Sequence, residues 1–229
     1  TEVRLLDFPA VFAAFFCLIS DWTTVRILST MVVQAYYLFA FWYLCRQADV
    51  DTKSTVMGAA MLLVPFSTPY ARLVLYHLYY ILYLANAFLI MGLTLKVLYS
   101  KGKALLPAVL LAGMWVYVGT NGIRHMMIIG IPMLAFAAIR CLLMMREYRW
   151  QDGKLTGPEM FWRTKPVKLL AILLVSCLCF LAGYVINGKV LLPYYDIRDM
   201  SSTFYMPGFK EPYFDQIYNG WMLASGIRY

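Results

Sequence analysis

Long runs of apolar residues constrain this chain more than any other feature of its sequence. Hydropathy marks about seven of them, with bounds uncertain by roughly 2–4 residues. They cover about 8–20, 27–45, 55–66, 73–98, 104–118, 126–145 and 169–187. Several approach the ~20 residues with which a helix crosses the ~30 Å hydrocarbon layer of a bilayer. The pattern predicts an all-α protein, a polytopic transmembrane helix bundle formed by residues 1–187.

The composition supports the membrane as the solvent for this chain. Of the 229 residues, 62% are hydrophobic and 14% are charged. A water-soluble domain of this size could not bury so much apolar surface. All five cysteines fall inside apolar segments without metal-like spacing, and we expect them to act as small hydrophobic residues. The pattern predicts no cofactor and no resident metal, and leaves a bound divalent metal open.

Two of the apolar segments are shorter than a simple spanning helix. Residues 8–20 and 55–66 are shorter than the ~17–25 residues of a simple spanning helix, so each is expected to be tilted into a thin region or only half-crossing. The second runs into VPFSTPY, where Pro65 and Pro69 interrupt helical hydrogen bonding. Such irregular backbone is stable only at the membrane interface or in a protein-lined cavity.

Basic residues orient the chain. Lys and Arg number 20 against 12 Asp and Glu, a net charge of +8, but they are spread through short loops, which argues against a nucleic-acid partner. With a cytoplasmic N-terminus and every segment crossing, 13 of the 20 lie on the inner side and the remainder on the outer side. The loop Arg146–Lys168 contributes most to this bias. We therefore predict a multi-pass plasma-membrane protein surrounded by membrane lipid, with that loop in the cytoplasm.

A mixed, aromatic-rich tail, residues 188–229, follows the last apolar segment. Pro212 can start a helix there and Gly226 can end one. Apolar residues recur between them at helical spacing: Phe214, Ile217, Tyr218 and Trp221. We expect a small extracytoplasmic region whose amphipathic helix lies on the outer membrane surface. Because the chain begins with Thr1 rather than Met, we expect it to be a piece of a longer protein.

Three short loops, each with one arginine, come to the outer face in this orientation. An arginine at the outer edge runs against the basic bias, and its fork of donors matches phosphate or carboxylate oxygens. The three arginines could surround one anionic headgroup; alternatively, each reaches separately to lipid phosphates. The loops are Asp21–Arg26, Ser67–Arg72 and Gly119–His125, and their arginines are Arg26, Arg72 and Arg124.

The loop GTNGIRH lies between two apolar runs and predicts a tight turn. Asn121-Gly122 favours a positive φ, which leaves Arg124 and His125 at the start of the next helix. Free backbone N–H groups and the helix dipole favour an anion there. Asn121 and Arg124 are therefore candidate substrate-binding residues. His125 could donate to an oxyanion or shuttle a proton; the alternative is a histidine whose hydrogen bonds are satisfied within the protein.

A polar-edged face runs along the fourth apolar segment. Five side chains recur on it at helical spacing: Tyr76, Tyr79, Tyr80, Tyr83 and Asn86. Lipid offers their polar groups no partners, so this face is expected to point into the protein or a wet cavity. Tyr80 and the adjacent His77 are candidate substrate-binding residues in such a cavity. Interhelical packing through tyrosine hydroxyl groups is the alternative.

Asp21 is the one acidic residue next to the arginine loops. It is the candidate catalytic residue, as a general base or a metal ligand. The alternative is a carboxylate that caps a helix. The sequence contains no Walker loop, zinc signature, GxSxG turn or dinucleotide fingerprint, so enzyme chemistry of the soluble type finds no support.

In architecture the chain resembles the C-type (GT-C) superfamily of multi-pass membrane glycosyltransferases. The likeness lies in short helices, outer loops with arginine, NGIRH before IIGIPML, and a last span followed by an outer aromatic region. The resemblance implies transfer of a sugar from a polyprenyl-phosphate donor, in cell-envelope polysaccharide or glycan assembly. It implies that Arg26, Arg72 and Arg124 hold the donor phosphate, while Asp21, or an acid outside this sequence, activates the acceptor hydroxyl.

Two other classes of function are compatible with the same residues. A transporter or flippase for an anionic or lipid-linked substrate would line its path with the tyrosine face of the fourth segment and guard the mouth with arginines. A structural subunit of a membrane assembly would use these residues for packing alone.

Overall fold

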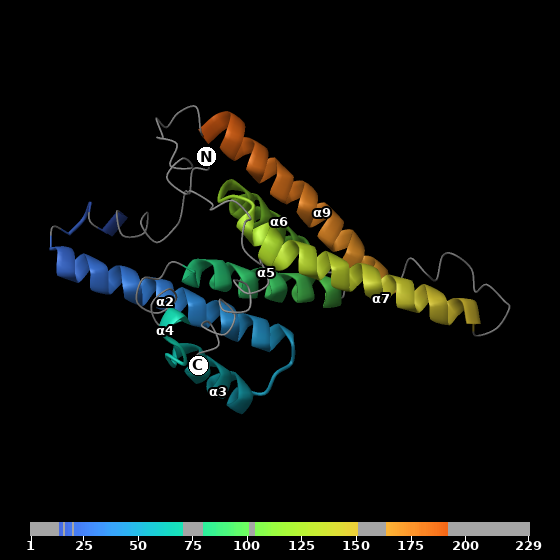
Figure 1. Ribbon diagram of the computed structural model, residues 1–229, viewed down its shortest axis with the longest axis horizontal. Coiled ribbons are helices and arrows are strands. Elements are labelled where there is room, and N and C mark those ends of the chain that lie inside the picture. The colour runs from blue at the N-terminus through green and yellow to red at the C-terminus, as the bar shows by residue number, and fades with distance from the viewer. Residues whose placement is uncertain are drawn as a thin grey trace, which may run out of the picture. The chain divides into compact units, whose positions relative to one another are not determined.

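The computed structural model describes residues 14–15, 17–19, 21–70, 80–100, 104–150 and 164–191, and every regular element among them is helical (Figure 1). Before the turn at Asn121 come α2 (Trp22–Gln47), α3 (Thr52–Leu63), α4 (Thr68–Tyr70), α5 (Ile81–Tyr99) and α6 (Leu105–Thr120). After it come η2 (Met126–Gly130), α7 (Ile131–Trp150), α9 (Lys165–Ile186) and η3 (Asn187–Leu191), where η2 and η3 are π-helical. The all-α prediction is confirmed for these residues.

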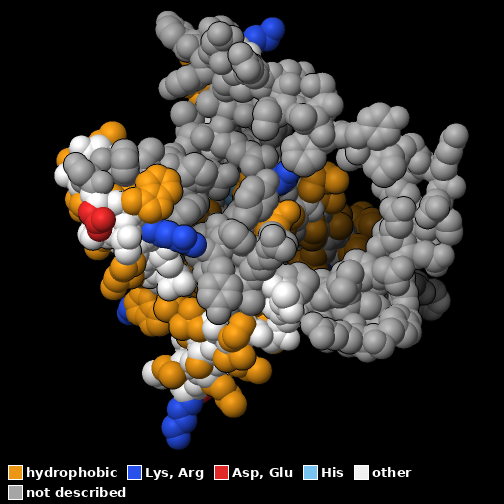
Figure 2. Space-filling view, turned by 60° about the vertical axis from the view of Figure 1, so that its left-hand side comes forward, with side chains coloured by type: hydrophobic (Ala, Val, Ile, Leu, Met, Phe, Trp, Pro, Cys, Tyr) orange, Lys and Arg blue, Asp and Glu red, His pale blue; other side chains and the backbone are white. Residues whose placement is uncertain are grey.

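Four helices are long and apolar enough to cross a membrane: Trp22–Gln47, Ile81–Tyr99, Met126–Met145 and Lys165–Leu191. Many of their large apolar side chains are exposed, and apolar side chains form much of the described surface seen in Figure 2. Such a surface is suited to lipid and would be a liability in water. These helices indicate a multi-pass membrane protein.

The predicted number of about seven crossings is not confirmed. The third apolar segment forms α3, whose 12 residues rise about 18 Å, less than the ~30 Å of a hydrocarbon core. The fifth forms α6, a shorter apolar helix of 16 residues. Most of residues 8–20, and the whole tail from 192 with its predicted amphipathic helix, lie outside the described residues. The described part of the chain supports four spanning helices.

Contacts divide the chain into two units. The described part of the first holds α2, α3, α4 and the start of α5 up to Asn86; that of the second runs from Ala87 through α6, α7, α9 and the π-helical turns. In the first unit, α2 buries one face whose residues recur at helical spacing. They are Val25, Ser29, Val33, Tyr37 and Ala40.

Tyr70 holds the irregular segment that follows α3. Its hydroxyl donates to the Leu62 carbonyl at 2.5 Å and lies 3.4 Å from the hydroxyl of buried Tyr37. Its backbone N–H donates to Ser67 Oγ at 3.2 Å, and its ring stacks on Phe66 with 4.2 Å between centroids. The helix break predicted from the prolines of VPFSTPY is confirmed. Protein contacts within the first unit satisfy polar groups of this backbone.

In the second unit, α6 and α9 cross at two glycines. A Cβ on Gly119 would collide with the backbone of Phe180, and a Cβ on Gly183 would collide with the backbone of Val116. Small residues let membrane helices approach closely, so that dispersion forces hold them together. Beside the crossing, the Trp115 indole meets the Phe180 ring edge-on, with 6.3 Å between centroids.

Two contacts align the ends of the helices in the second unit. The Lys165 ammonium lies 4.6 Å from the centroid of the Tyr99 ring, so the end of α5 and the start of α9 lie side by side. Asn187 Nδ2 donates to the Thr120 carbonyl and joins the end of α9 to the end of α6. Both contacts are compatible with the predicted topology, and the orientation of the chain in the membrane stays a prediction.

Candidate functional site

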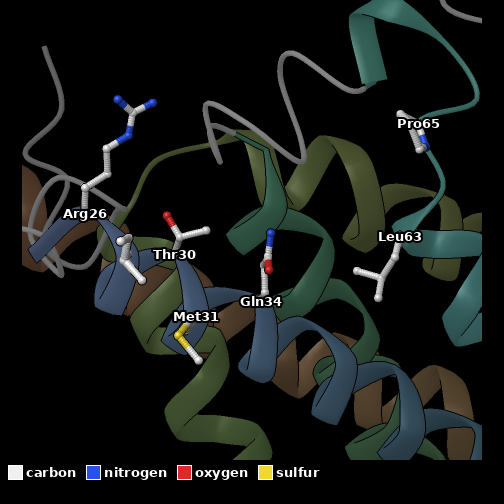
Figure 3. Close-up of a pocket in the computed structure, with 7 residues that line it drawn as sticks. Arg26, Thr30, Met31, Gln34, Leu63 and Pro65 are labelled. Atoms are coloured by element: carbon white, nitrogen blue, oxygen red, sulfur yellow. The ribbon is translucent and has the colours of Figure 1, made fainter. Parts of the chain in front are cut away.

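A groove of about 580 Å³ lies in the first unit, between α2 and the segment after α3. Figure 3 shows Arg26, Thr30 and Gln34 projecting from α2 on one side of the groove, with Leu63 and Pro65 across from them. Ile27 and Met31 complete the lining. The groove therefore combines one cation and two neutral hydrogen-bonding groups with apolar walls.

The polar residues of the groove form a row along α2. Arg26, Thr30 and Gln34 are separated by four residues each, so they share one face and descend about 6 Å per step. Arg26 is exposed, close to the start of the helix, whereas Thr30 and Gln34 are half-buried. A cation at a helix end within reach of the headgroup level, followed by polar groups at greater depth, can bind the polar part of an amphiphile.

The opposite wall of the groove is positioned by Tyr70. Leu63 and Pro65 lie within three positions after Leu62, whose carbonyl accepts the hydrogen bond of the Tyr70 hydroxyl. Because Tyr70 also lies against Tyr37 on the buried face of α2, the wall is tied to the helix that carries the polar row. Arg26 was predicted from the sequence as a binding residue, whereas Thr30 and Gln34 were not. The lone amide of Gln34 inside an apolar run was the available signal.

Asp21 is the N-cap of α2. Its carboxylate accepts hydrogen bonds from the hydroxyl of Thr24 at 2.5 Å and from the Thr24 backbone N–H at 2.8 Å. These bonds favour the charged form and lower the pKa of Asp21 below its ordinary value, the hydroxyl contributing most. The alternative interpretation, a helix-capping carboxylate, describes this geometry. A catalytic role for Asp21 stays a prediction.

The predicted turn at Asn121 is confirmed. Gly122 has a φ of 95°, and the helix resumes at Arg124. Asn121 is buried, and its Nδ2 donates to the Tyr117 carbonyl at 3.0 Å. Its Oδ1 accepts no hydrogen bond from any described residue. Such a buried oxygen can accept a hydrogen bond from a bound water or ligand.

Arg124 and His125 differ in their exposure. Arg124 is half-buried, whereas only 3% of His125 is exposed. Burial disfavours the imidazolium and lowers the pKa of His125 from 6.5 to about 4. His125 is therefore neutral at physiological pH, and it would act on an anion through a hydrogen bond rather than through charge.

Asn187 is a buried polar residue beside this turn that the sequence analysis missed. Its side chain bonds the carbonyl of Thr120, whose own hydroxyl donates to the Tyr117 carbonyl at 2.7 Å. The π-helical segment η3 begins at Asn187, and the π-helical segment η2 follows the turn at Asn121. Such segments are enriched at functional sites. A single amide at the end of a long apolar run was the signal that could have identified Asn187.

The predicted polar face of the fourth segment is described only in part. Tyr83 and Asn86 are buried, and the Tyr36 hydroxyl of α2 donates to Asn86 Oδ1 at 2.8 Å. The rings of Tyr80 and Tyr83 lie 6.1 Å apart. The described end of this face therefore points into the protein, with an interhelical bond of the kind named as the packing alternative. His77, like Arg72, lies outside the described residues.

The structure leaves the joint arginine site a prediction. Arg26 belongs to the first unit and Arg124 to the second, so each is described by its own surroundings. All five cysteines are free. Within the ranges that the structure describes, no three His, Cys, Asp or Glu residues gather in a group that could hold a metal ion.

Comparison with known proteins adds no residue to the site. No family model, curated protein or solved structure matches this chain.

Proposed function

We propose that this integral membrane protein binds a polyprenyl-phosphate-linked sugar in the α2 groove and uses it as a glycosyl donor in cell-envelope polysaccharide or glycan assembly. One observation carries the proposal: exposed Arg26 lies near the end of a spanning helix, above a groove with apolar walls. The guanidinium fork fits the phosphate, and the apolar walls fit the polyprenyl chain. The bias of basic residues supports placing this end of α2 at the outer face of the plasma membrane.

The transfer would proceed at the anomeric carbon of the donor sugar. The acceptor hydroxyl oxygen bonds to that carbon as the bond from the carbon to the phosphate oxygen breaks, releasing polyprenyl phosphate. Negative charge grows on the leaving phosphate, where Arg26, and Arg124 by the resemblance, would stabilise it. The acceptor proton passes to a base, which in this proposal is Asp21.

Thr30 and Gln34 favour a second candidate, a transporter or flippase for an anionic or lipid-linked substrate. They line the same groove at about 6 and 12 Å beyond Arg26 along α2. A polyprenyl chain offers no partner for a hydroxyl or an amide at that depth. A sugar headgroup moving into the membrane would hydrogen-bond to both, as in other polar paths through bilayers.

The two candidates are separated in proteoliposomes that contain the full chain and a radiolabelled polyprenyl-phosphate sugar. Transfer to an acceptor and appearance of the sugar in the opposite leaflet are measured on the same vesicles. If the protein is a glycosyltransferase, Arg26→Gln should lose sugar transfer and Gln34→Leu should keep it. If the protein is a flippase, both variants should lose translocation of the sugar. Undiminished transfer in Arg26→Gln and in Arg124→Ala would contradict the enzyme proposal.

Asp21 has its own test, since capping and catalysis can be separated by substitution. Asparagine caps helices about as well as aspartate but cannot accept the acceptor proton. Asp21→Asn should therefore preserve the thermal stability and abolish transfer if Asp21 is the base. Full transfer in Asp21→Asn restricts Asp21 to its role as a cap and moves the base elsewhere.

A further inference from the structure

A second pocket lies at the opposite end of α2 from the groove. It has a volume of about 480 Å³ and is formed by the end of α2, the connecting loop and the start of α3. Arg46 and Asp49 both line it, one on the last turn of the helix and the other in the loop. The structure describes both side chains, yet no ion pair joins them. The pocket thus presents two separated opposite charges.

Arg46 is held over an aromatic ring. Its guanidinium carbon lies 5.4 Å from the centroid of the Trp42 ring, one helical turn earlier. Trp42 is 43% exposed at the end of a spanning helix, where tryptophan rings favour the headgroup level of a bilayer. The guanidinium is therefore stacked on a ring at the depth where lipid phosphates lie.

Asp49 occupies a position at the end of α2 where glycine is the usual residue. Its φ is 54°, in the left-handed region, directly after the C-cap Ala48 of α2. The Val50 N–H donates to the Cys45 carbonyl at 3.0 Å. This bond closes a type of helix ending in which glycine usually occupies the position of Asp49. A carboxylate also repels the negative end of the helix dipole. A cation bound in the pocket would offset this repulsion.

We propose that this pocket binds the headgroup of a zwitterionic phospholipid, with its phosphate on Arg46 and its ammonium on Asp49. In such a headgroup the two charges are joined by a short carbon chain, and the pocket holds its complementary charges apart without pairing them. Val50 and Val56 also line the pocket and are exposed, so they face the region of the lipid glycerol and acyl chains. The site is separate from the groove near Arg26 and does not depend on the function proposed for that groove.

Native mass spectrometry of the full chain, purified in mild detergent, tests this assignment. The protein is offered phosphatidylethanolamine, or phosphatidylglycerol with the same acyl chains, which has the phosphate without the ammonium. We expect the protein to retain about fivefold more phosphatidylethanolamine than phosphatidylglycerol, because only the ammonium can pair with Asp49. Asp49→Asn should reduce that retention to the level of phosphatidylglycerol, and Arg46→Gln should lower the retention of both lipids. Lys53→Gln, an exposed charge beside the pocket that does not line it, is the matched control.

A second variant separates binding from folding. Asp49→Gly removes the carboxylate and relieves the left-handed backbone, so it should raise the melting temperature in detergent while losing the preference for phosphatidylethanolamine. Equal retention of both lipids by the unsubstituted protein would overturn the proposal. So would an unchanged preference in Asp49→Asn or in Asp49→Gly, because neither variant can bind the ammonium through a carboxylate.

Discussion

Arg26 and Gln34 line the same groove although they lie eight residues apart on α2. The helical repeat brings them to one face, with Thr30 between them and about 12 Å of rise from end to end. A cation near the end of a spanning helix and an amide at greater depth are costly in lipid unless they have polar partners. Their common groove gives both access to one bound molecule. Arg26 supports the binding of a donor phosphate, and Gln34 favours the alternative function of a flippase.

Arg26→Gln should weaken binding of polyprenyl phosphate about tenfold, which corresponds to ~1.4 kcal/mol. The substitution removes the charge and the donor fork and keeps an uncharged amide of moderate length. The affinity of Arg26→Lys should lie between those of the unsubstituted protein and Arg26→Gln, because lysine keeps the charge but not the fork of donors. Binding is measured by titration of detergent-solubilised protein. The corresponding polyprenyl alcohol is the control ligand, and a similar loss of affinity for it would show that the phosphate is not recognised.

Tyr70→Phe should loosen the wall of the groove. The change removes the hydroxyl that bonds the Leu62 carbonyl, which costs about 1 kcal/mol of folding free energy. We expect a lower melting temperature and weaker lipid-phosphate binding together. Tyr43→Phe is the matched control on α2, since its hydroxyl has no hydrogen-bond partner among the described residues. Equal effects of the two substitutions would exclude a special role for Tyr70.

Gly119→Ala should destabilise the second unit by about 1–3 kcal/mol, because the added methyl group meets the backbone of Phe180. Gly113→Ala on the same helix is the control, since open space surrounds that position and alanine is the better helix former. Thermal unfolding in detergent measures both. A Gly119→Ala protein as stable as Gly113→Ala would contradict the close crossing of α6 and α9.

Because of His125, the protein should become less stable as the pH decreases below about 6.5. Its pKa is about 4 in the folded protein and 6.5 when unperturbed, so the unfolded chain binds the proton between these values and the folded chain does not. The loss should reach about 2 kcal/mol at pH 5, with little change above pH 7. His125→Gln should flatten this pH dependence. If the pH dependence of stability persists in His125→Gln and disappears in His77→Gln, it arises from His77.

Local features of the fold followed from the sequence because they depend on neighbouring residues. The apolar runs predicted the spanning helices, the prolines of VPFSTPY predicted the end of α3 near Leu63, and Asn121-Gly122 predicted the positive φ at Gly122. Each of these depends on backbone geometry within a few positions. The short α3 was expected as well. The number of crossings was the exception, because an apolar pattern does not show whether a short segment crosses the membrane completely.

Features that join distant positions could not be predicted. Gly119 lies on α6 and Gly183 on α9, far apart in the sequence, and nothing in either local pattern identifies the other as its neighbour. The groove depends in the same way on residues of α2 and on the segment after α3. Asp21 shows a related limit. A carboxylate before a helix suits both capping and catalysis, and only its bonds to Thr24 reveal the capping geometry.

Site-specific photocrosslinking distinguishes a lipid-linked phosphate bound in the α2 groove from bulk lipid. A photoreactive residue replaces Met31, which lines the groove, or its exposed neighbour Val32, which does not. We expect labelled polyprenyl phosphate to crosslink at position 31, Arg26→Gln to reduce this product, and position 32 to yield little. Equal crosslinking at both positions, unaffected by Arg26→Gln, would show that the groove does not bind the lipid-linked phosphate specifically.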